Sequence, residues 1–253
     1  MNEQMVIEKQ LLSFVCKGNK SGRAVLFLHG WRSQKEVWQG TFDALLKEHP
    51  EFCIIALDLP GFGSSSLPVG DWKVGDYADL VAEFIKKMEL KDLVLVGHSF
   101  GGRVAVKLSS VRTDLVKRLV LVDAAGFVMQ KAKKDALNLA AKIVKPLFKP
   151  KFMQGLRKKI YKSLGAEDYV ETPELRQVYL NAVNEDLTPN LKRILQPTLI
   201  VFGENDADTP VAYGKQMNSL ILNSKLQIIK NAGHFSFVDK PNEFVNLLND
   251  FIS

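Results

Sequence analysis

The sequence contains few of the residues that build metal centres or disulfide-linked folds. Its 253 residues include only two cysteines, Cys16 and Cys53, and four histidines. No spacing of these residues matches a zinc site, and cysteines within apolar, strand-like segments are typical of buried, reduced thiols. We therefore expect no metal ion, no disulfide and a cytoplasmic protein.

Long apolar runs are also missing. No segment approaches the roughly 18 apolar residues that cross a bilayer, and the N-terminal residues MNEQM lack the basic and apolar regions of a secretory signal. With 46% hydrophobic and 25% charged residues, the chain is long enough to bury one sizeable core.

Acidic residues are nearly absent from one segment. Residues 130–165 carry eleven Lys or Arg residues and one acid, Asp135, which gives +10 within a chain of net charge +6 and leaves −4 for the rest. Such asymmetry informs about partners rather than about the fold. We interpret the segment as a solvated basic face; the alternative is docking on an acidic partner or an anionic membrane.

Phosphate-binding signatures are missing as well. The glycine-rich loop at residues 58–64 has neither a Gly-x-Gly-x-x-Gly spacing nor a Gly-Lys-Ser/Thr ending. We therefore expect no nucleotide cofactor. The expected partner is a small molecule, with no nucleic acid.

Short apolar runs alternate with helical patterns along most of the chain, which predicts a parallel sheet covered by helices on both faces. The strand-like runs are residues 6–17 (one or two edge strands), 24–28, 53–57, 93–96, 118–122, 198–201 and 226–229. The helical patterns are residues 34–48, 76–88, 100–111, 211–222 and the segment after Pro241.

The alternation stops between residues 130 and about 193. This segment reads as short helices interrupted at prolines, so we interpret it as an insertion between two core strands. The predicted organisation is an α/β core formed by residues 1–127 and 194–253, with a strongly basic helical cap at residues 128–193.

The most informative motif is GHSFG at residues 97–101, which lies between an apolar strand and a helical pattern. A serine between two glycines at such a junction is the arrangement of a nucleophile elbow, in which a strained turn exposes the serine Oγ. Ser99 is therefore a candidate nucleophile. It needs a base, an orienting acid and donors for a developing oxyanion.

Other strand ends supply these groups. Asp206 follows the strand-like run at 198–201, His234 follows the run at 226–229, and His29-Gly30-Trp31 follows the run at 24–28. Asp208 is an alternative acid, but its position before Thr209-Pro210 predicts a helix cap.

Together these motifs resemble the α/β-hydrolase superfamily over nearly the whole chain. The matching segments are residues 29–31, 58–64, 97–102, 203–206 and 233–234. The resemblance implies an eight-stranded, mostly parallel sheet with a helical cap. It also implies Ser99 as nucleophile, Asp206 as acid and His234 as base.

The same resemblance implies oxyanion donors in the main-chain N–H groups of Trp31 and Phe100, whereas His29 and His98 are expected to be structural. The predicted function is hydrolysis of a carboxylic ester with a small-to-medium apolar acyl group, through an acyl-enzyme and without a cofactor. The residues expected around the substrate are Gly30, Trp31, Phe100, Arg103, Phe127 and Phe235.

Alternatives remain open from the sequence. Arg103 follows the elbow as in the menaquinone-pathway lyase of this fold. The first alternative is therefore a lyase or a C–C bond hydrolase that acts on a carboxylate-bearing substrate. Arg103 can instead form a structural ion pair. A ligand-binding receptor on a hydrolase scaffold is a third possibility. Haloalkane dehalogenase and epoxide hydrolase chemistry are disfavoured, because both need a carboxylate in place of Ser99.

Overall fold

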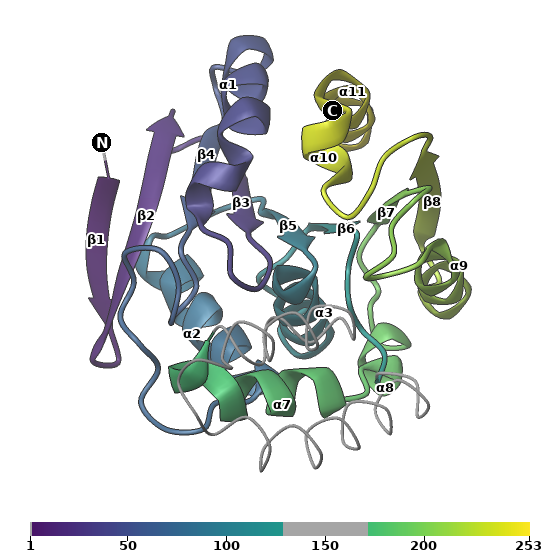
Figure 1. Ribbon diagram of the computed structural model, residues 1–253. Coiled ribbons are helices and arrows are strands. Elements are labelled where there is room, and N and C mark those ends of the chain that lie inside the picture. Colours follow the sequence, from purple (N-terminus) through teal and green to yellow (C-terminus); the bar gives the residue numbers. More distant parts are fainter. Residues whose placement is uncertain (1, 129–171) are drawn as a thin grey trace, which may run out of the picture.

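The computed structural model describes residues 2–128 and 172–253 and contains one eight-stranded sheet (Figure 1). The strand order is β1-β2-β4-β3-β5-β6-β7-β8. The strands are β1 (Asn2–Ile7), β2 (Gln10–Gly18), β3 (Ala24–Leu28), β4 (Cys53–Leu57), β5 (Val94–His98), β6 (Arg118–Val122), β7 (Thr198–Gly203) and β8 (Ser224–Ile229). Strands β1 and β2 pair antiparallel, as do β2 and β4; the other five pairings are parallel. The predicted mostly parallel, eight-stranded α/β-hydrolase fold is confirmed.

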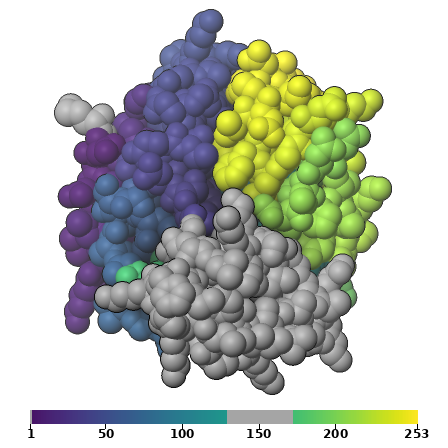
Figure 2. All heavy atoms as spheres, viewed as in Figure 1, coloured from purple at the N-terminus to yellow at the C-terminus, as the bar shows by residue number. Residues whose placement is uncertain are grey.

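Helices cover both faces of the sheet. The helices of the core are η1 (Lys35–Trp38), α1 (Gln39–Glu48), α2 (Val74–Lys87), α3 (Phe100–Val111), α9 (Val211–Leu220), α10 (Ser236–Asp239) and α11 (Pro241–Ile252). One apolar core lies between the sheet and α1, α10 and α11, and the other lies between the sheet and α2, α3 and α9. On the first face, α1 and α11 lie side by side (Figures 1 and 2). Because both faces are covered, every residue of β3, β4 and β5 is buried.

Most predicted elements match these boundaries within a few residues. The helical pattern at 34–48 divides into the 3₁₀ turn η1 and the helix α1, and the edge segment divides into the hairpin β1–β2. Helix α10 was not predicted, because four residues are too short to show a helical period.

The described end of the predicted insertion is helical. It contains η3 (Pro173–Leu175), α7 (Arg176–Asn184) and α8 (Thr188–Leu191). Pro173 and Pro189 lie in the first turns of η3 and α8 rather than interrupting a helix, because the first helical turn requires no N–H donor. The basic segment at 130–165 lies outside the described residues. The cap boundaries 128–193 stay a prediction.

Candidate active site

Ser99 occupies the sharp turn between β5 and α3. Its φ of 50° and ψ of −111° lie in a region that side chains avoid. Space is equally restricted: a Cβ on Gly101 would lie 2.4 Å from the main-chain oxygen of Leu28. Only glycine fits at position 101, so the turn can pack closely against β3. Ser99 is half-buried at the carboxyl edge of the sheet.

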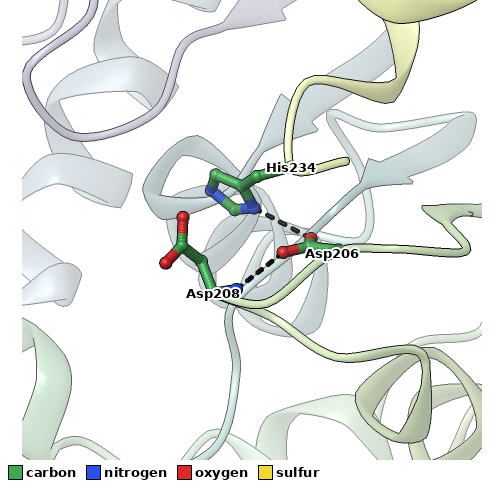
Figure 3. Close-up of side chains that lie close together, drawn as sticks. All are labelled: Asp206, Asp208 and His234. Carbon is green, nitrogen blue, oxygen red and sulfur yellow. Dashed lines mark hydrogen bonds and ion pairs between the residues drawn. The ribbon is translucent and has the colours of Figure 1, made fainter. Parts of the chain in front are cut away.

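Three side chains from separate strand ends form one hydrogen-bonded line. The Nε2 atom of His234 lies 3.0 Å from the Oγ of Ser99, and its Nδ1 atom lies 2.9 Å from an Oδ of Asp206. Figure 3 shows the imidazole directed at the Asp206 carboxylate. The sequence-predicted nucleophile, base and acid are therefore brought together at the ends of β5, β7 and β8.

The surroundings favour a charged acid beside the imidazole. Burial alone would lower the pKa of His234, but the hydrogen bond and negative charge of Asp206 raise this pKa above its ordinary value. Burial would raise the pKa of Asp206, but its hydrogen bond to His234 and the charge of that ring lower it, with help from Thr209. Proton uptake at Nε2 is thus supported by a fixed carboxylate on the other side of the ring.

Donors from the following turn hold Asp206 in place. One carboxylate oxygen accepts the N–H groups of Asp208 at 2.8 Å and Thr209 at 2.9 Å, and the Thr209 hydroxyl lies 2.7 Å from the other. The predicted capping of the next helix by Asp208 is wrong. Helix α9 begins at Val211 with no side-chain cap, and Asp208 instead contributes its main-chain N–H to Asp206.

Asp123, at the end of β6, is a positioning residue that the sequence reasoning missed. One of its carboxylate oxygens accepts the N–H of Gly203 at 2.7 Å; the other accepts the N–H and the hydroxyl of Ser236, at 3.0 and 2.6 Å. It thereby joins the loop that carries Asp206 to the loop that carries His234. The available signal was an acid directly after an apolar strand, the same signal that identified Asp206.

His98 and His29 are structural, as expected. Both are buried, and burial lowers the pKa of His98 to about 3 and that of His29 to about 4. His98 Nε2 lies 2.7 Å from the main-chain oxygen of His234, so the neutral ring anchors the loop that carries His234. His29 Nε2 accepts the N–H of Leu59 at 3.0 Å, which links the turn after β3 to the loop after β4.

A buried ion pair holds that second loop. The Nζ of Lys35 lies 2.7 Å from Asp58, which also accepts the main-chain N–H groups of Lys35 and Ser64. Burial would lower the pKa of Lys35, but the contacts with Asp58 and Glu36 raise it. The acid that begins the glycine-rich loop is therefore a loop anchor.

The turn after β3 lies directly against the serine. A Cβ on Gly30 would lie 2.8 Å from His98 Nδ1 and 3.2 Å from the Ser99 Cβ, so only a glycine lets this backbone pass so close. Phe100 begins α3, and a first-turn N–H has no acceptor within its own helix. Of the two expected oxyanion donors, Phe100 thus follows Ser99 directly in the chain, and Trp31 follows Gly30, which passes close to Ser99.

Aromatic rings gather beside this turn. The indole of Trp31 lies 5.0 Å from Phe62, 5.1 Å from Phe100 and 5.2 Å from Tyr179 between ring centroids. Tyr77 adds a further contact with Phe100 at 5.1 Å. The sequence identified Trp31 and Phe100 but missed Phe62, Tyr77 and Tyr179, because they come from loop 58–64, α2 and α7.

The other predicted pocket residues have different environments. Phe235 is 41% exposed and lies 5.5 Å from the His234 ring, whereas Phe127 packs on Tyr213 at 5.2 Å. Arg103 is buried, and its guanidinium donates to two main-chain oxygens, those of Glu185 at 2.8 Å and Phe127 at 2.7 Å. The structural ion pair considered for Arg103 is replaced by bonds to carbonyl groups, while Lys107 makes the ion pair with Glu185 at 2.9 Å.

One group of ligand-type atoms lies in the site. Carboxylate oxygens of Asp206 and Asp208 and a ring nitrogen of His234 lie within 4.8 Å of one another (Figure 3). Since the oxygens of Asp206 already accept the bonds described above, we assign this group no metal.

In residues 2–128 and 172–253, no helix has the length and apolar character needed to cross a membrane.

A mostly parallel sheet with a strained serine after β5, an acid after β7 and a histidine after β8 defines the class of α/β hydrolases. The family comparison agrees: the model of the alpha/beta hydrolase family matches residues 25–247. The chain belongs to this family, and the resemblance inferred from its motifs is confirmed.

Individual relatives cover nearly the whole chain. The AB hydrolase superfamily protein YisY of Bacillus subtilis (strain 168) is 28% identical over 252 residues, which are 91% of this chain and 91% of that protein. The pimeloyl-[acyl-carrier protein] methyl ester esterase of Nitrosomonas europaea is 26% identical, and the match covers 89% of this chain and 94% of the esterase. Among solved structures, an esterase from Exiguobacterium antarcticum has a TM-score of 0.80 at 22% identity, covering 100% and 99% of the two chains, which shows a shared fold.

Proposed function

We propose that this α/β hydrolase is a serine esterase that cleaves carboxylic esters with small-to-medium apolar acyl groups. The observation that carries the proposal is the line of hydrogen bonds from Ser99 through His234 to Asp206. Such a line lets a weakly acidic hydroxyl act as a nucleophile at neutral pH, because its proton passes to the imidazole during attack.

The reaction follows from these positions. His234 Nε2 takes the Ser99 proton while Oγ attacks the ester carbonyl carbon, and the carbonyl oxygen becomes an oxyanion. The N–H groups of Trp31 and Phe100 donate to that oxygen, and such fixed donors contribute about 3–4 kcal/mol each in related chemistry. His234 then protonates the departing alkoxide, and later activates water to release the acid from Ser99.

The substrate class rests on the rings beside the serine. Trp31, Phe62, Phe100 and Tyr179 form an apolar surface next to the proposed oxyanion donors. Burying an acyl chain there is favourable by about 25 cal/mol per Å² of apolar area. The esterase activities named for the Nitrosomonas and Exiguobacterium proteins support an ester substrate.

No observation favours lyase or C–C hydrolase chemistry over ester hydrolysis. Those alternatives need Arg103 to hold a substrate carboxylate, and this residue instead donates to the carbonyl oxygens of Glu185 and Phe127. A receptor function would leave the hydrogen-bonded line without a role.

The test is turnover of nitrophenyl esters of increasing acyl length, beside a matched amide and a thioester. We expect ester hydrolysis with a preference for short-to-medium acyl chains. Ser99→Ala should lower kcat by at least about 10³-fold with little change in folding, since loss of the nucleophile leaves only binding and oxyanion contributions. A fluorophosphonate should label wild type and not the variant. Undiminished turnover by Ser99→Ala would exclude the mechanism, and a folded wild type that turns over none of the panel would favour a receptor.

A further inference from the structure

The two cysteines, remote in sequence, meet on neighbouring strands. Cys16 lies on β2 and Cys53 on β4, and their sulfur atoms are 3.6 Å apart. In the antiparallel ladder Cys16 pairs with Ile55 and Gly18 pairs with Cys53, so the cysteines are diagonal neighbours on one face of the sheet. Both are free thiols.

From this contact we propose that Cys16 and Cys53 form a reversible intramolecular disulfide when the protein meets a peroxide. A disulfide has an S–S distance of about 2.05 Å, so the sulfurs must close by roughly 1.6 Å. The proposal requires a side-chain rotation and a small strand adjustment to close this distance. This modification is separate from the proposed esterase function.

The two thiols have different environments, which assigns them different roles. Cys16 is half-buried and reachable by a small oxidant, whereas Cys53 is 1% exposed. The hydrogen bond from Cys53 lowers the pKa of Cys16, against the opposing effects of burial and Glu3, and Lys20 lowers it further. The same bond and burial raise the pKa of Cys53. Cys16 is therefore the attacking thiolate and Cys53 the resolving thiol.

The chemistry balances with hydrogen peroxide as oxidant. The Cys16 sulfur attacks one peroxide oxygen, the O–O bond breaks, and hydroxide leaves as water, which gives a sulfenic acid on Cys16. The Cys53 sulfur then attacks the Cys16 sulfur, the S–O bond breaks and the S–S bond forms. The hydroxyl group leaves with the Cys53 proton as a second water. Two thiols lose two electrons, and one peroxide is reduced to two waters.

The cross-link would fasten the edge of the sheet. Among the strands that the structure describes, the β1–β2 hairpin pairs with the rest of the sheet through the β2–β4 ladder, from Phe14–Leu57 to Gly18–Cys53. A disulfide at this end of the ladder closes the loop between residues 16 and 53, which holds α1 and the turn after β3. Constraining such a loop stabilises a fold mainly by restricting the unfolded chain.

The experiment uses the full chain, reduced, desalted and treated with a modest excess of hydrogen peroxide. We expect both thiols to disappear together, an intact mass lower by about 2 Da, no dimer, and full reversal by dithiothreitol. The oxidised protein should have a Tm higher by at least about 4 °C.

Two variants, each checked for folding by circular dichroism, separate the roles. In Cys53→Ser, Cys16 should stop at a sulfenic acid, about 16 Da heavier and trapped by a dimedone-type reagent. In Cys16→Ser, the buried Cys53 should remain reduced. Thiols that stay free in wild type at a peroxide level that oxidises Cys53→Ser would overturn the proposal. So would oxidation of wild-type Cys16 to a sulfinic acid beside a free Cys53, disulfide-linked dimers, or no reaction in any of the proteins.

Discussion

Replacing Asp123 with Asn tests whether one buried carboxylate aligns the proposed active site. The substitution keeps the shape of the side chain but exchanges an oxygen for an NH₂ group. The carboxylate accepts three bonds, from the N–H of Gly203 and from the N–H and hydroxyl of Ser236. The hydroxyl can reverse and accept from the amide, but the two N–H groups cannot.

The expected loss of stability follows from the number of donors that the Asp123 carboxylate satisfies. Whichever way the Asn amide is oriented, one main-chain N–H, of Gly203 or of Ser236, faces an NH₂ group and loses its acceptor. An unsatisfied buried donor costs about 1–3 kcal/mol. We expect the free energy of unfolding to fall by that amount, measured as a lower denaturant midpoint at unchanged m-value. Asp239→Asn is the matched control: its carboxylate accepts the N–H of Gly233 at 2.7 Å in an exposed position, and the retained oxygen can keep that bond.

Activity should fall as well, because the two bonds join the loops of Asp206 and His234. We expect kcat to fall by about 10–100-fold in Asp123→Asn, with a smaller change in KM, since small misplacements of catalytic groups have effects of this size. The kcat of Asp239→Asn should stay within about twofold of the wild-type value. An Asp123→Asn protein as stable and as active as wild type would refute the positioning role.

The pH dependence of stability adds a further check. Burial raises the pKa of Asp123 to about 7, against the opposing effect of its three donors. The folded protein then holds this proton more tightly than the unfolded chain, so ionisation as the pH rises from about 4 through about 7 removes stability. The stability advantage of wild type over Asp123→Asn should therefore be larger at pH 5 than at pH 8. An advantage that grows across this interval would show that the donors outweigh burial.

Three further predictions concern the same machinery. Activity should be lost as the pH falls through the raised pKa of His234, so the midpoint of the acid limb of kcat/KM should lie above about 6.5. Asp206→Asn should lower kcat by about 10³–10⁴-fold, because the imidazole then takes the wrong tautomer. The kcat of Asp208→Asn should stay within about threefold of wild type, and the acid limb should move to lower pH, since Asp208 raises the pKa of His234. The reverse ranking of the two variants would make Asp208 the acid. Gly101→Ala should reduce the free energy of unfolding by about 1–3 kcal/mol, because its Cβ would lie 2.4 Å from a main-chain oxygen; in Gly75→Ala, where the nearest atom is 3.8 Å away, the unfolding free energy should not fall.

The sequence alone predicted the sheet and the hydrogen-bonded line, since both depend on local patterns. Apolar runs identify strands that are buried on both faces, and the carboxyl ends of parallel strands meet at one edge. Ser99, Asp206 and His234 each lie within a few residues after such a run. Their meeting is therefore a consequence of the strand order, with no long-range information needed.

What the sequence could not predict depends on contacts between distant segments. Phe62 and Tyr179 read as ordinary loop and helix residues until the fold places them beside Trp31. The sulfur contact of Cys16 and Cys53 likewise depends on the register of β2 and β4, which no local pattern specifies.

At Arg103, a substrate-binding role and a structural role predict clearly different outcomes. Its two hydrogen bonds reach the carbonyl groups of Phe127, just before the predicted cap, and Glu185, in the described end of the cap. A buried carbonyl that loses its donor costs about 1–3 kcal/mol, so Arg103→Met should reduce the free energy of unfolding by about 2–6 kcal/mol, and Arg103→Lys, which can keep one bond, by less.

The substrate readout is a neutral ester and its carboxylate-bearing counterpart, compared at low and high salt. If Arg103 is structural, the ratio of their kcat/KM values should change by less than about threefold in Arg103→Lys, and any preference for the anion should fade with salt, as for solvated lysines screened within about 10 Å. A preference for the anionic ester above about a hundredfold that resists salt and disappears in Arg103→Lys would reverse this assignment. A buried charged contact resists screening, so that result would favour the carboxylate-handling chemistry over the apolar ester.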